Sequence, residues 1–384
     1  MNRKGERKIL IVAGETSGDL HGAHLVKAAL SLDPNLRFYG VGGKHLRSIG
    51  IDVVFDSSEV AVVGFVEVIS KLRSIYRIFR WLKRSFDCDR PALAILIDFP
   101  DFNLRLAKEA NKRGIPVFYY ISPQVWAWRR GRVKKIAKLV HKLVVILPFE
   151  VPFYRQRNID CEFVGHPLID IVKPHLSRNE ALEIFRLDRG KRTIGLFPGS
   201  RREEVQKLLP VLLKSVHLLL RDFPNLQFIV PIAPAIKRFE IEENIARFHL
   251  NVRVVEEHIY DVLNICDLII TASGTATLEA AIMNTPMIII YKVSFLSYLV
   301  ARLLVKVKNI GLVNLIAEKR IVPELIQGQA SPMNIFNETS KMLKNPDLLF
   351  MIKGELDKVT EKLGNPGASQ RVAQILYRVV RQGA

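Results

Sequence analysis

The sequence is poor in the features that mark secreted, metal-binding or membrane-spanning proteins. Its three cysteines, Cys88, Cys161 and Cys266, are far apart and form no CxxC pair, which argues against a disulfide framework or zinc site and suits a reducing compartment. The apolar stretch at residues 9–13 is too short for a signal peptide. No apolar run reaches the roughly 18 residues of a spanning helix, because Lys292 interrupts the longest candidate. We therefore expect a cytoplasmic protein that does not cross a bilayer.

The sequence also lacks two common nucleotide-binding motifs, and it has fewer acidic than basic residues. The sequence has neither a GxxxxGK[ST] phosphate loop nor a GxGxxG motif, which argues against ATP or a nicotinamide dinucleotide as the ligand. Only 38 Asp and Glu stand against 57 Lys and Arg, a formal net charge of +19. This surplus favours a polyanionic partner, either nucleic acid or anionic lipid, although a well-solvated surface would also account for it.

The residues that are present predict two α/β domains. Short apolar runs alternate with amphipathic segments, as in parallel sheets that helices cover on both faces. We expect strands at residues 8–13, 37–41, 93–98, 117–121 and 142–147 in the first half. In the second half we expect them at 193–197, 227–231, 251–255, 268–271 and 287–291, with a helix at 204–220.

Glycine and proline mark the link between the two halves. Gly165, Pro167 and Pro174 interrupt both periodicities. We therefore expect two doubly wound Rossmann-like domains that face each other across a cleft. The first domain is expected at residues 1–170 and the second at 171–345. Helices at 346–384 are expected to pack back on the first domain.

Two strand-to-helix turns in the second domain are candidate anion sites. One strand leads through Ser273, Gly274 and Thr275 into a helix, and free backbone N–H groups at such a turn bind phosphate. Another strand leads to Ser200 and Arg201, whose guanidinium would neutralise a diphosphate. An ordinary hydroxyl cap and a surface arginine would have the same sequence. Two such turns without an ATP or dinucleotide fingerprint favour a nucleotide sugar.

The first domain offers a candidate catalytic base. The strand expected at 93–98 ends in Asp98, and the carboxyl ends of parallel strands border the ligand site. Apolar neighbours would raise the pKa of Asp98 toward the range of a general base, although a buried structural acceptor is an equal alternative. Asp101 precedes a helix expected at 103–112 and is interpreted as its N-terminal cap.

One expected helix has the pattern of a membrane-surface helix. Between residues 65 and 86 apolar side chains recur at intervals of three and four, and six cations but no acid occur from Ser70 to Phe86. Such a helix lies in a lipid interface, and a core helix with a basic outer face is the alternative. The predicted membrane contacts are Phe65, Val68, Ile69, Leu72, Arg73, Ile75, Tyr76, Phe79 and Arg80.

Two further stretches, at 126–138 and 295–308, combine cations with aromatic or apolar residues. RNA binding would also explain them, because aromatic side chains interleaved with arginine stack on bases. No recognised nucleic-acid fold signature accompanies them. We therefore expect an anionic membrane surface, and no nucleic acid, as the partner.

Several motifs together resemble those of the lipid-A-disaccharide synthase family. They occur in family order from about residue 9 to 330, so the resemblance covers nearly the whole chain. The motifs are AGETSGD at 13–19, IDFPDFN at 97–103, YISPQVWAW at 120–128, VGHPL at 164–168, PGSR at 198–201, ASGTATLE at 272–279, NLI at 314–316 and PEL at 323–325.

The resemblance implies an inverting, metal-independent glycosyltransferase with two Rossmann-like domains of the GT-B type. The implied donor is UDP-2,3-diacylglucosamine, and the implied acceptor is 2,3-diacylglucosamine 1-phosphate. The products would be a β-1,6-linked disaccharide phosphate and UDP, formed in lipid A biosynthesis. No cofactor is expected. The implied location is peripheral, on the cytoplasmic side of the inner membrane of a Gram-negative-type bacterium, and a homodimer is left open.

The resemblance also implies roles for individual residues. Asp98 would take the proton from the acceptor 6-hydroxyl as it attacks the anomeric carbon. Backbone N–H groups from Ser273 to Thr275, with Arg201, would stabilise the leaving diphosphate. The full predicted donor site is Ser200, Arg201, Ser273, Gly274, Thr275, Glu279 and Asn314. The predicted acceptor site is Gly14, Ser17, Gly18 and Asp19.

Two other functional classes remain open at this point. One is a different two-domain UDP-sugar enzyme, such as an undecaprenyl-linked transferase or a sugar-nucleotide epimerase, although an epimerase would not need the cationic helix. The other is a nucleic-acid-binding module, which only the net charge favours.

Overall fold

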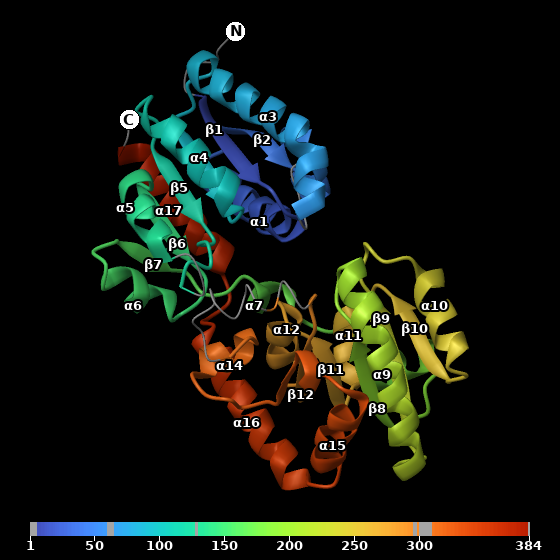
Figure 1. Ribbon diagram of the computed structural model, residues 1–384. Coiled ribbons are helices and arrows are strands. Elements are labelled where there is room, and N and C mark those ends of the chain that lie inside the picture. Colours follow the sequence, from blue (N-terminus) through green and yellow to red (C-terminus); the bar gives the residue numbers. More distant parts are fainter. Residues whose placement is uncertain (1–5, 60–64, 127–129, 295–297, 299–308, 383–384) are drawn as a thin grey trace. The chain divides into compact units, whose positions relative to one another are not determined.

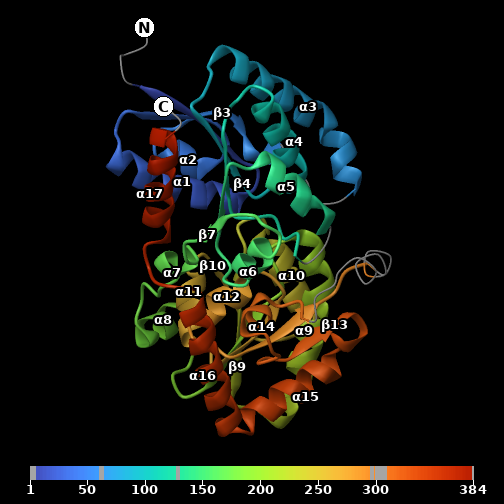
Figure 2. The ribbon, with the colours of Figure 1, turned by 90° about the vertical axis from the view of Figure 1, so that its left-hand side faces the viewer.

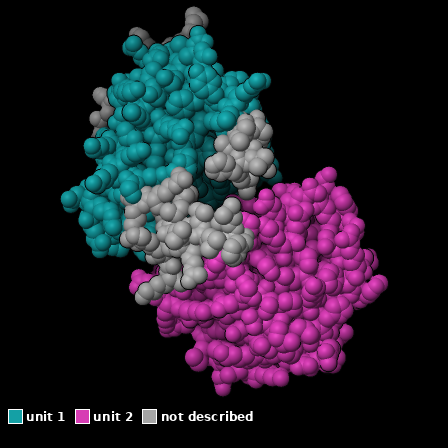
Figure 3. Space-filling view, in the orientation of Figure 1, with its two compact units in different colours: residues 1–167, 364–384 teal, residues 168–363 magenta. Residues whose placement is uncertain are grey.

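The computed structural model describes residues 6–59, 65–126, 130–294, 298 and 309–382, and for residues 65–71, 130 and 382 it describes the backbone alone. The chain divides into two compact units (Figure 3). Unit 1 comprises Met1–Pro167 and Gly364–Ala384, and unit 2 comprises Leu168–Leu363. Each unit is built on a parallel sheet with helices on both faces, which confirms the predicted pair of doubly wound α/β domains.

Unit 1 has a seven-stranded sheet in the order β3-β2-β1-β4-β5-β6-β7, with every neighbouring pair parallel. Its strands are β1 (Arg7–Ala13), β2 (Leu36–Gly42), β3 (Asp52–Asp56), β4 (Leu93–Ile97), β5 (Val117–Tyr120), β6 (Lys142–Val145) and β7 (Cys161–Phe163). The strand order reverses between β1 and β4. In doubly wound sheets, ligands bind at this switch point, beyond the carboxyl ends of the strands.

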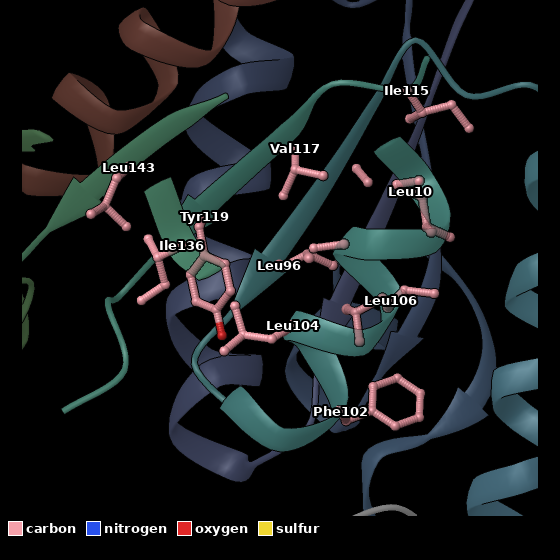
Figure 4. Close-up of a cluster of buried hydrophobic side chains, with 14 of the residues drawn as sticks. Leu10, Leu96, Phe102, Leu104, Leu106, Ile115, Val117, Tyr119, Ile136 and Leu143 are labelled. Carbon is pink, nitrogen blue, oxygen red and sulfur yellow. The ribbon is translucent and has the colours of Figure 1, made fainter. Parts of the chain in front are cut away.

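The long helices of unit 1 form two layers. On one face lie α3 (Phe65–Cys88), α4 (Pro100–Asn111) and α5 (Val133–Leu139), and on the other α1 (Thr16–Leu32) packs beside α17 (Ala368–Gln382) (Figures 1 and 2). The shorter helices are α2 (Lys44–Ser48) and α6 (Glu150–Arg155). Figure 4 shows the core under the first layer, where Leu96 and Tyr119 of the sheet meet Leu104, Leu106 and Ile136 of the helices.

Unit 2 repeats this topology with six parallel strands in the order β10-β9-β8-β11-β12-β13. The strands are β8 (Arg192–Phe197), β9 (Leu226–Ile232), β10 (Val252–Glu256), β11 (Leu268–Ala272), β12 (Met287–Tyr291) and β13 (Glu324–Ile326). Its switch point lies between β8 and β11. The helices described are α7 (Leu168–Ile171), α8 (Arg178–Ile184), α9 (Arg202–Asp222), α10 (Arg238–Arg247), α11 (Ile259–Ile265), α12 (Ala276–Ile282), α14 (Leu312–Ala317), α15 (Pro332–Leu343) and α16 (Pro346–Lys362).

The ten predicted strands are confirmed to within about two residues at each end. The sequence did not predict β3, β7 or β13, the last of which adds the outermost strand of unit 2. The segment 346–384, expected to return as a whole to the first domain, is divided: α16 belongs to unit 2 and α17 to unit 1. No helix in the described ranges is both long and apolar enough to span a membrane.

The start of α4 corrects one prediction. Asp101 lies inside the first turn of α4 and is not its N-terminal cap. The helix begins at Pro100, because proline fixes a helical φ and has no N–H to satisfy at that position. The preceding residue, Phe99, has left-handed backbone geometry (φ 46°) and makes no side-chain capping bond.

Candidate functional site

A strained turn carries Asp98 at the carboxyl end of β4, beside the switch point of unit 1. Asp98 and Phe99 both have positive φ angles, 45° and 46°, which costs roughly 1–2 kcal/mol per residue that is not glycine. The buried Asn103 amide donates to the carbonyl oxygens of Ile97 (3.1 Å) and Asp98 (2.8 Å), and the Tyr119 hydroxyl donates to the Asp98 carbonyl (2.5 Å). These buried partners hold the turn, and backbone strain of this kind is typical of functional sites.

The Asp98 carboxyl is half-buried. Burial and, as a smaller cause, the nearby Glu15 carboxylate together raise its pKa to about 7. A carboxyl group with a pKa near neutrality can accept a proton at physiological pH, as a general base must. Glu15, exposed in the turn after β1, was not predicted as a site residue. Its one sequence signal is its position within the motif at 13–19.

The predicted acceptor residues in the same turn have different surroundings. Gly14 and Gly18 are buried, whereas Ser17 is exposed. A Cβ atom at Gly14 would lie 2.4 Å from the Phe99 ring, and one at Gly18 would lie 3.4 Å from Ile97. The absence of a side chain at Gly14 therefore lets the Asp98 turn pack against the end of β1.

Asp19, the fourth predicted acceptor residue, is buried in a structural role. Its carboxylate accepts the backbone N–H groups of Gly43 (2.6 Å), His45 (2.8 Å) and Leu46 (3.3 Å). It thereby holds the turn between β2 and α2. We leave Asp19 out of the residues proposed below to contact substrate, because both of its oxygens are already engaged.

A second buried acid, Glu150, is the first residue of α6, five residues after the end of β6. Glu150 accepts the indole N–H of Trp126 at 3.2 Å and the backbone N–H of Leu147 at 3.1 Å, and burial raises its pKa to about 8. Trp126 is therefore a core residue and not an interfacial one, contrary to the interpretation of the stretch 126–138. Residues 127–129 of that stretch lie outside the described part of the chain.

At the switch point of unit 2, a cavity of about 350 Å³ opens beyond the carboxyl ends of β8 and β11. Six of the seven residues predicted for the donor line it: Ser200, Arg201, Ser273, Gly274, Thr275 and Glu279. Tyr260 donates to the Glu279 carboxylate at 3.4 Å, and burial raises the pKa of Glu279. The cavity thus unites both strand-to-helix turns that the sequence singled out.

The turn after β11 differs from the prediction in one respect. The Ser273 N–H is not available to a ligand, because it donates to the Ile290 carbonyl (3.1 Å) and so continues the β11–β12 ladder. The Ser273 hydroxyl donates to the Ile310 carbonyl at 3.2 Å. Within the described structure, the N–H groups of Gly274, Thr275 and Ala276 have no protein acceptor, and these three residues line the cavity.

The turn after β8 requires a glycine. Gly199 has a φ of 113°, and a Cβ atom there would lie 2.5 Å from the Glu204 carboxylate. Glu204 lies 3.8 Å from the Arg201 guanidinium, whose side chain is 58% exposed, so the ion pair is loose and the guanidinium is open to a ligand. Glu204 lines the cavity but was not predicted, and its position three residues after Arg201 was the available signal.

Asn314, the seventh predicted donor residue, is absent from the cavity lining and fully buried. Its amide donates to the Val322 carbonyl (3.0 Å) and the Glu324 carboxylate (2.8 Å), and its oxygen accepts the N–H groups of Ile321 and Val322. Glu324 also accepts the N–H of Ile310. Asn314 therefore fixes the loop to which the Ser273 hydroxyl bonds, one step away from the cavity.

The helix predicted at residues 65–86 is present as α3, and its apolar residues divide into two groups. Leu72 and Tyr76 are 51% and 64% exposed. Ile75 and Phe79 pack against the core, where the Phe79 and Phe102 ring centroids are 5.7 Å apart. Arg73 and Arg80 are exposed. The side chains of Phe65, Val68 and Ile69, and most of the stretch 295–308, lie outside the described structure. Among the α3 side chains that the structure describes, one group therefore packs against the core, and the other forms an exposed surface of apolar and basic residues.

Solved structures with a similar fold include an enzyme named as a nucleotide-sugar epimerase and one named as a sugar transferase. A UDP-GlcNAc 2-epimerase from Neisseria meningitidis, bound to UDP-GlcNAc, gives a TM-score of 0.64 at 12% identity over 98% of this chain and 100% of that one. The spinosyn rhamnosyltransferase gives 0.62 at 11% identity over 97% and 100%. At these identities the likeness shows the fold alone, two Rossmann-like domains of the GT-B type.

Sequence comparisons are more specific. A family model described as lipid-A-disaccharide synthetase matches residues 9–379. Lipid-A-disaccharide synthases from Geobacter metallireducens and Geobacter sulfurreducens are 50% and 49% identical to this chain over 380 residues, which is 99% of this chain and of each relative. The chain therefore belongs to the lipid-A-disaccharide synthase family, the glycosyltransferases that form the disaccharide of lipid A.

Proposed function

We propose that the chain transfers the sugar of UDP-2,3-diacylglucosamine to the 6-hydroxyl of 2,3-diacylglucosamine 1-phosphate, with inversion and without a metal. The bond between the anomeric carbon and the diphosphate oxygen breaks, a β-1,6 bond to the acceptor oxygen forms, and the hydroxyl proton passes to a base. UDP leaves with the electron pair. The observation that carries this proposal is the Asp98 carboxyl, held at a switch point with a pKa of about 7.

The donor is proposed to bind in the cavity of unit 2. Free N–H groups of Gly274, Thr275 and Ala276 would bind the diphosphate, and the Arg201 guanidinium would offset the charge that grows as UDP leaves. Glu279, in the first turn of α12, would accept from ribose hydroxyls. The Neisseria meningitidis neighbour with bound UDP-GlcNAc supports a UDP-sugar as the ligand.

The acceptor is proposed to bind to unit 1, with its 6-hydroxyl at Asp98. Ionised Asp98 would take the proton as the new bond forms, and the exposed Ser17 hydroxyl in the neighbouring turn would help to orient the sugar. Gly14 and Gly18 would act through packing, because Phe99 of the Asp98 turn lies against Gly14 and Ile97 of β4 lies against Gly18.

We further propose that the protein works on the cytoplasmic side of the inner membrane, where both lipid substrates would be present. Leu72 and Tyr76 on α3 would enter the lipid interface while Arg73 and Arg80 meet lipid phosphates. These exposed apolar and basic side chains on one helix support a peripheral contact.

A coupled assay of UDP release with both diacylated substrates tests the proposal, with and without a chelator. UDP should appear only when the acceptor is present, the rate should not change with chelator, and NMR of the product should show a β-1,6 linkage. A sugar-nucleotide epimerase would consume no acceptor, so UDP-sugar turnover independent of the acceptor would reject the transferase assignment. Pelleting with cardiolipin-containing vesicles at low salt tests the membrane contact separately.

A further inference from the structure

A groove between α4 and α5 on unit 1 is lined by clustered cations that take no part in the function proposed above. We propose that it binds the phosphate group of the acceptor lipid, an inference that rests on the function proposed above. The groove has a volume of about 480 Å³. Its lining consists of Pro100, Asp101, Leu104, Arg105, Lys108, Arg132, Lys135, Lys138 and Leu139.

Most of the charge in the groove is not neutralised by the protein. The lining contains five cations and a single acid, Asp101, which is paired with Arg132. The other four cations, Arg105, Lys108, Lys135 and Lys138, form no ion pair with any residue that the structure describes. Four like charges around one concave surface repel one another, and a bound dianion would relieve this repulsion.

The helices themselves put these cations in two facing rows. Asp101, Arg105 and Lys108 follow one another at intervals of four and three, so they lie on one side of α4. Lys135 and Lys138 are likewise three residues apart on α5. A phosphate in the groove can therefore receive charged hydrogen bonds from both helices, which is the arrangement that binds phosphate strongly.

Another part of α4 shows that unpaired charge is not general on this surface. Glu109 lies there within 3.2 Å of Lys83, 2.9 Å of Lys112 and 3.1 Å of Arg113. Those contacts lower the pKa of Glu109 to about 2. Glu109 thus neutralises three cations beside the groove, whereas four of the five cations that line the groove have no acidic partner in the described structure, which indicates that the groove is complementary to an external anion.

The position of the groove favours the acceptor over a bilayer. Its lining starts at Pro100 and Asp101, two and three residues after Asp98. At about 1.5 Å of rise per residue, Arg105 lies about 7–8 Å along α4 from Pro100, the scale of one sugar ring with its phosphate. Among the described residues, neither α4 nor α5 has an exposed large apolar side chain that could enter a lipid phase. The shared chemistry is a phosphate ester, and its proposed source is the acceptor.

The test compares short-chain acceptors with and without the 1-phosphate. In the wild-type protein, kcat/KM should be higher for the phosphorylated acceptor. Lys108→Gln combined with Lys135→Gln should raise the KM for that acceptor at least fivefold, the scale of losing two exposed charge contacts. The values for the unphosphorylated acceptor and the KM for the donor should stay within twofold. A matched control, Lys27→Gln with Lys353→Gln, removes the same charge from exposed positions on α1 and α16 and should change neither acceptor.

A direct binding measurement separates this proposal from the reaction itself. NMR titration with glucosamine 1-phosphate should shift groove resonances in the wild type and not in the double variant. Equal losses with both acceptors, or an unchanged preference for the phosphorylated one, would overturn the proposal. If the double variant loses vesicle binding but keeps its acceptor preference, the groove serves the bilayer and the proposal is wrong. If the wild type makes no disaccharide but still binds glucosamine 1-phosphate, the proposed reaction fails while the groove remains a phosphate site.

Discussion

A general base must be ionised to act, so the pKa of Asp98 should set the acidic limb of the pH profile. Burial and the Glu15 carboxylate raise that pKa to about 7 from an ordinary 3.8. Below pH 7 the ionised fraction falls about tenfold per unit, and kcat/KM should fall with it. An aspartate with an ordinary pKa would instead give a constant rate between pH 5 and 8.

Glu15→Gln tests the cause of this shift. The substitution removes a negative charge that opposes ionisation of Asp98 and keeps the size of an exposed side chain. The pKa of Asp98 should therefore fall, and the acidic limb should move to lower pH. Burial, the larger cause, is unchanged, so the limb should stay well above 3.8. The midpoint of the limb is the readout, because it is independent of any change in the maximal rate.

The assay is UDP release from pH 5 to 8.5 at constant ionic strength, with donor saturating and acceptor varied. Asp98→Asn keeps the shape of the side chain and should lower turnover by about 10² to 10⁴ while UDP binding stays intact. A profile that is flat for the wild type, or a limb that does not move in Glu15→Gln, would refute the reasoning. Near-normal turnover in Asp98→Asn would remove this residue from the role of base.

Four further predictions concern the donor cavity, an exposed glycine on α16 that serves as a control, and the membrane contact. Arg201→Ala should lower kcat/KM by about 10²-fold without lowering the melting temperature, because the guanidinium is exposed and acts on the leaving diphosphate. Gly199→Ala should destabilise the protein by about 1–3 kcal/mol in thermal unfolding, since its φ is 113° and the new Cβ meets Glu204. Gly354→Ala, in the open on α16, should be neutral or stabilising by up to about 1 kcal/mol. Leu72→Gln with Tyr76→Gln should weaken vesicle pelleting and leave the melting temperature unchanged, because both side chains are exposed. Equal pelleting of wild type and variant would reject that contact.

The interior strands could be predicted because burial on both faces makes them continuous apolar runs. β4, with the sequence LAILI, has all five residues buried. The three missed strands carry a weaker signal. β7 and β13 have only three residues each, CEF and ELI. β3 has no fully buried residue, because its side chains are either exposed or partly buried. Each lies at the end of its sheet and pairs on one side. Such short edge strands resemble loops in sequence, and only tertiary pairing defines them.

The donor site was largely predictable for a topological reason. In a doubly wound sheet the two strands beside the switch point end at the same place, so the turns after β8 and β11 must converge although about 70 residues separate them. Glu15 and Glu204 were not predicted, because their roles depend on neighbours that the sequence does not specify. Glu15 acts on Asp98 from the turn after β1, and Glu204 packs over Gly199.

Asp19 and Asn314 show the limit of interpreting polar motif residues as ligand contacts. Both are buried, and backbone or side-chain partners occupy their oxygens. A sequence motif does not distinguish a polar residue that contacts a ligand from one that holds the neighbouring loop. Both roles need a fixed residue type at a fixed position. Hydrogen-bond accounting separates them: a buried group whose donors and acceptors are already satisfied has none left for a ligand. By that criterion Asn314 supports the cavity without lining it. It bonds to Glu324, which accepts the N–H of Ile310, and the Ile310 carbonyl in turn accepts the Ser273 hydroxyl. Gly274, Thr275 and Ala276, whose N–H groups have no acceptor in the described structure, form the binding surface.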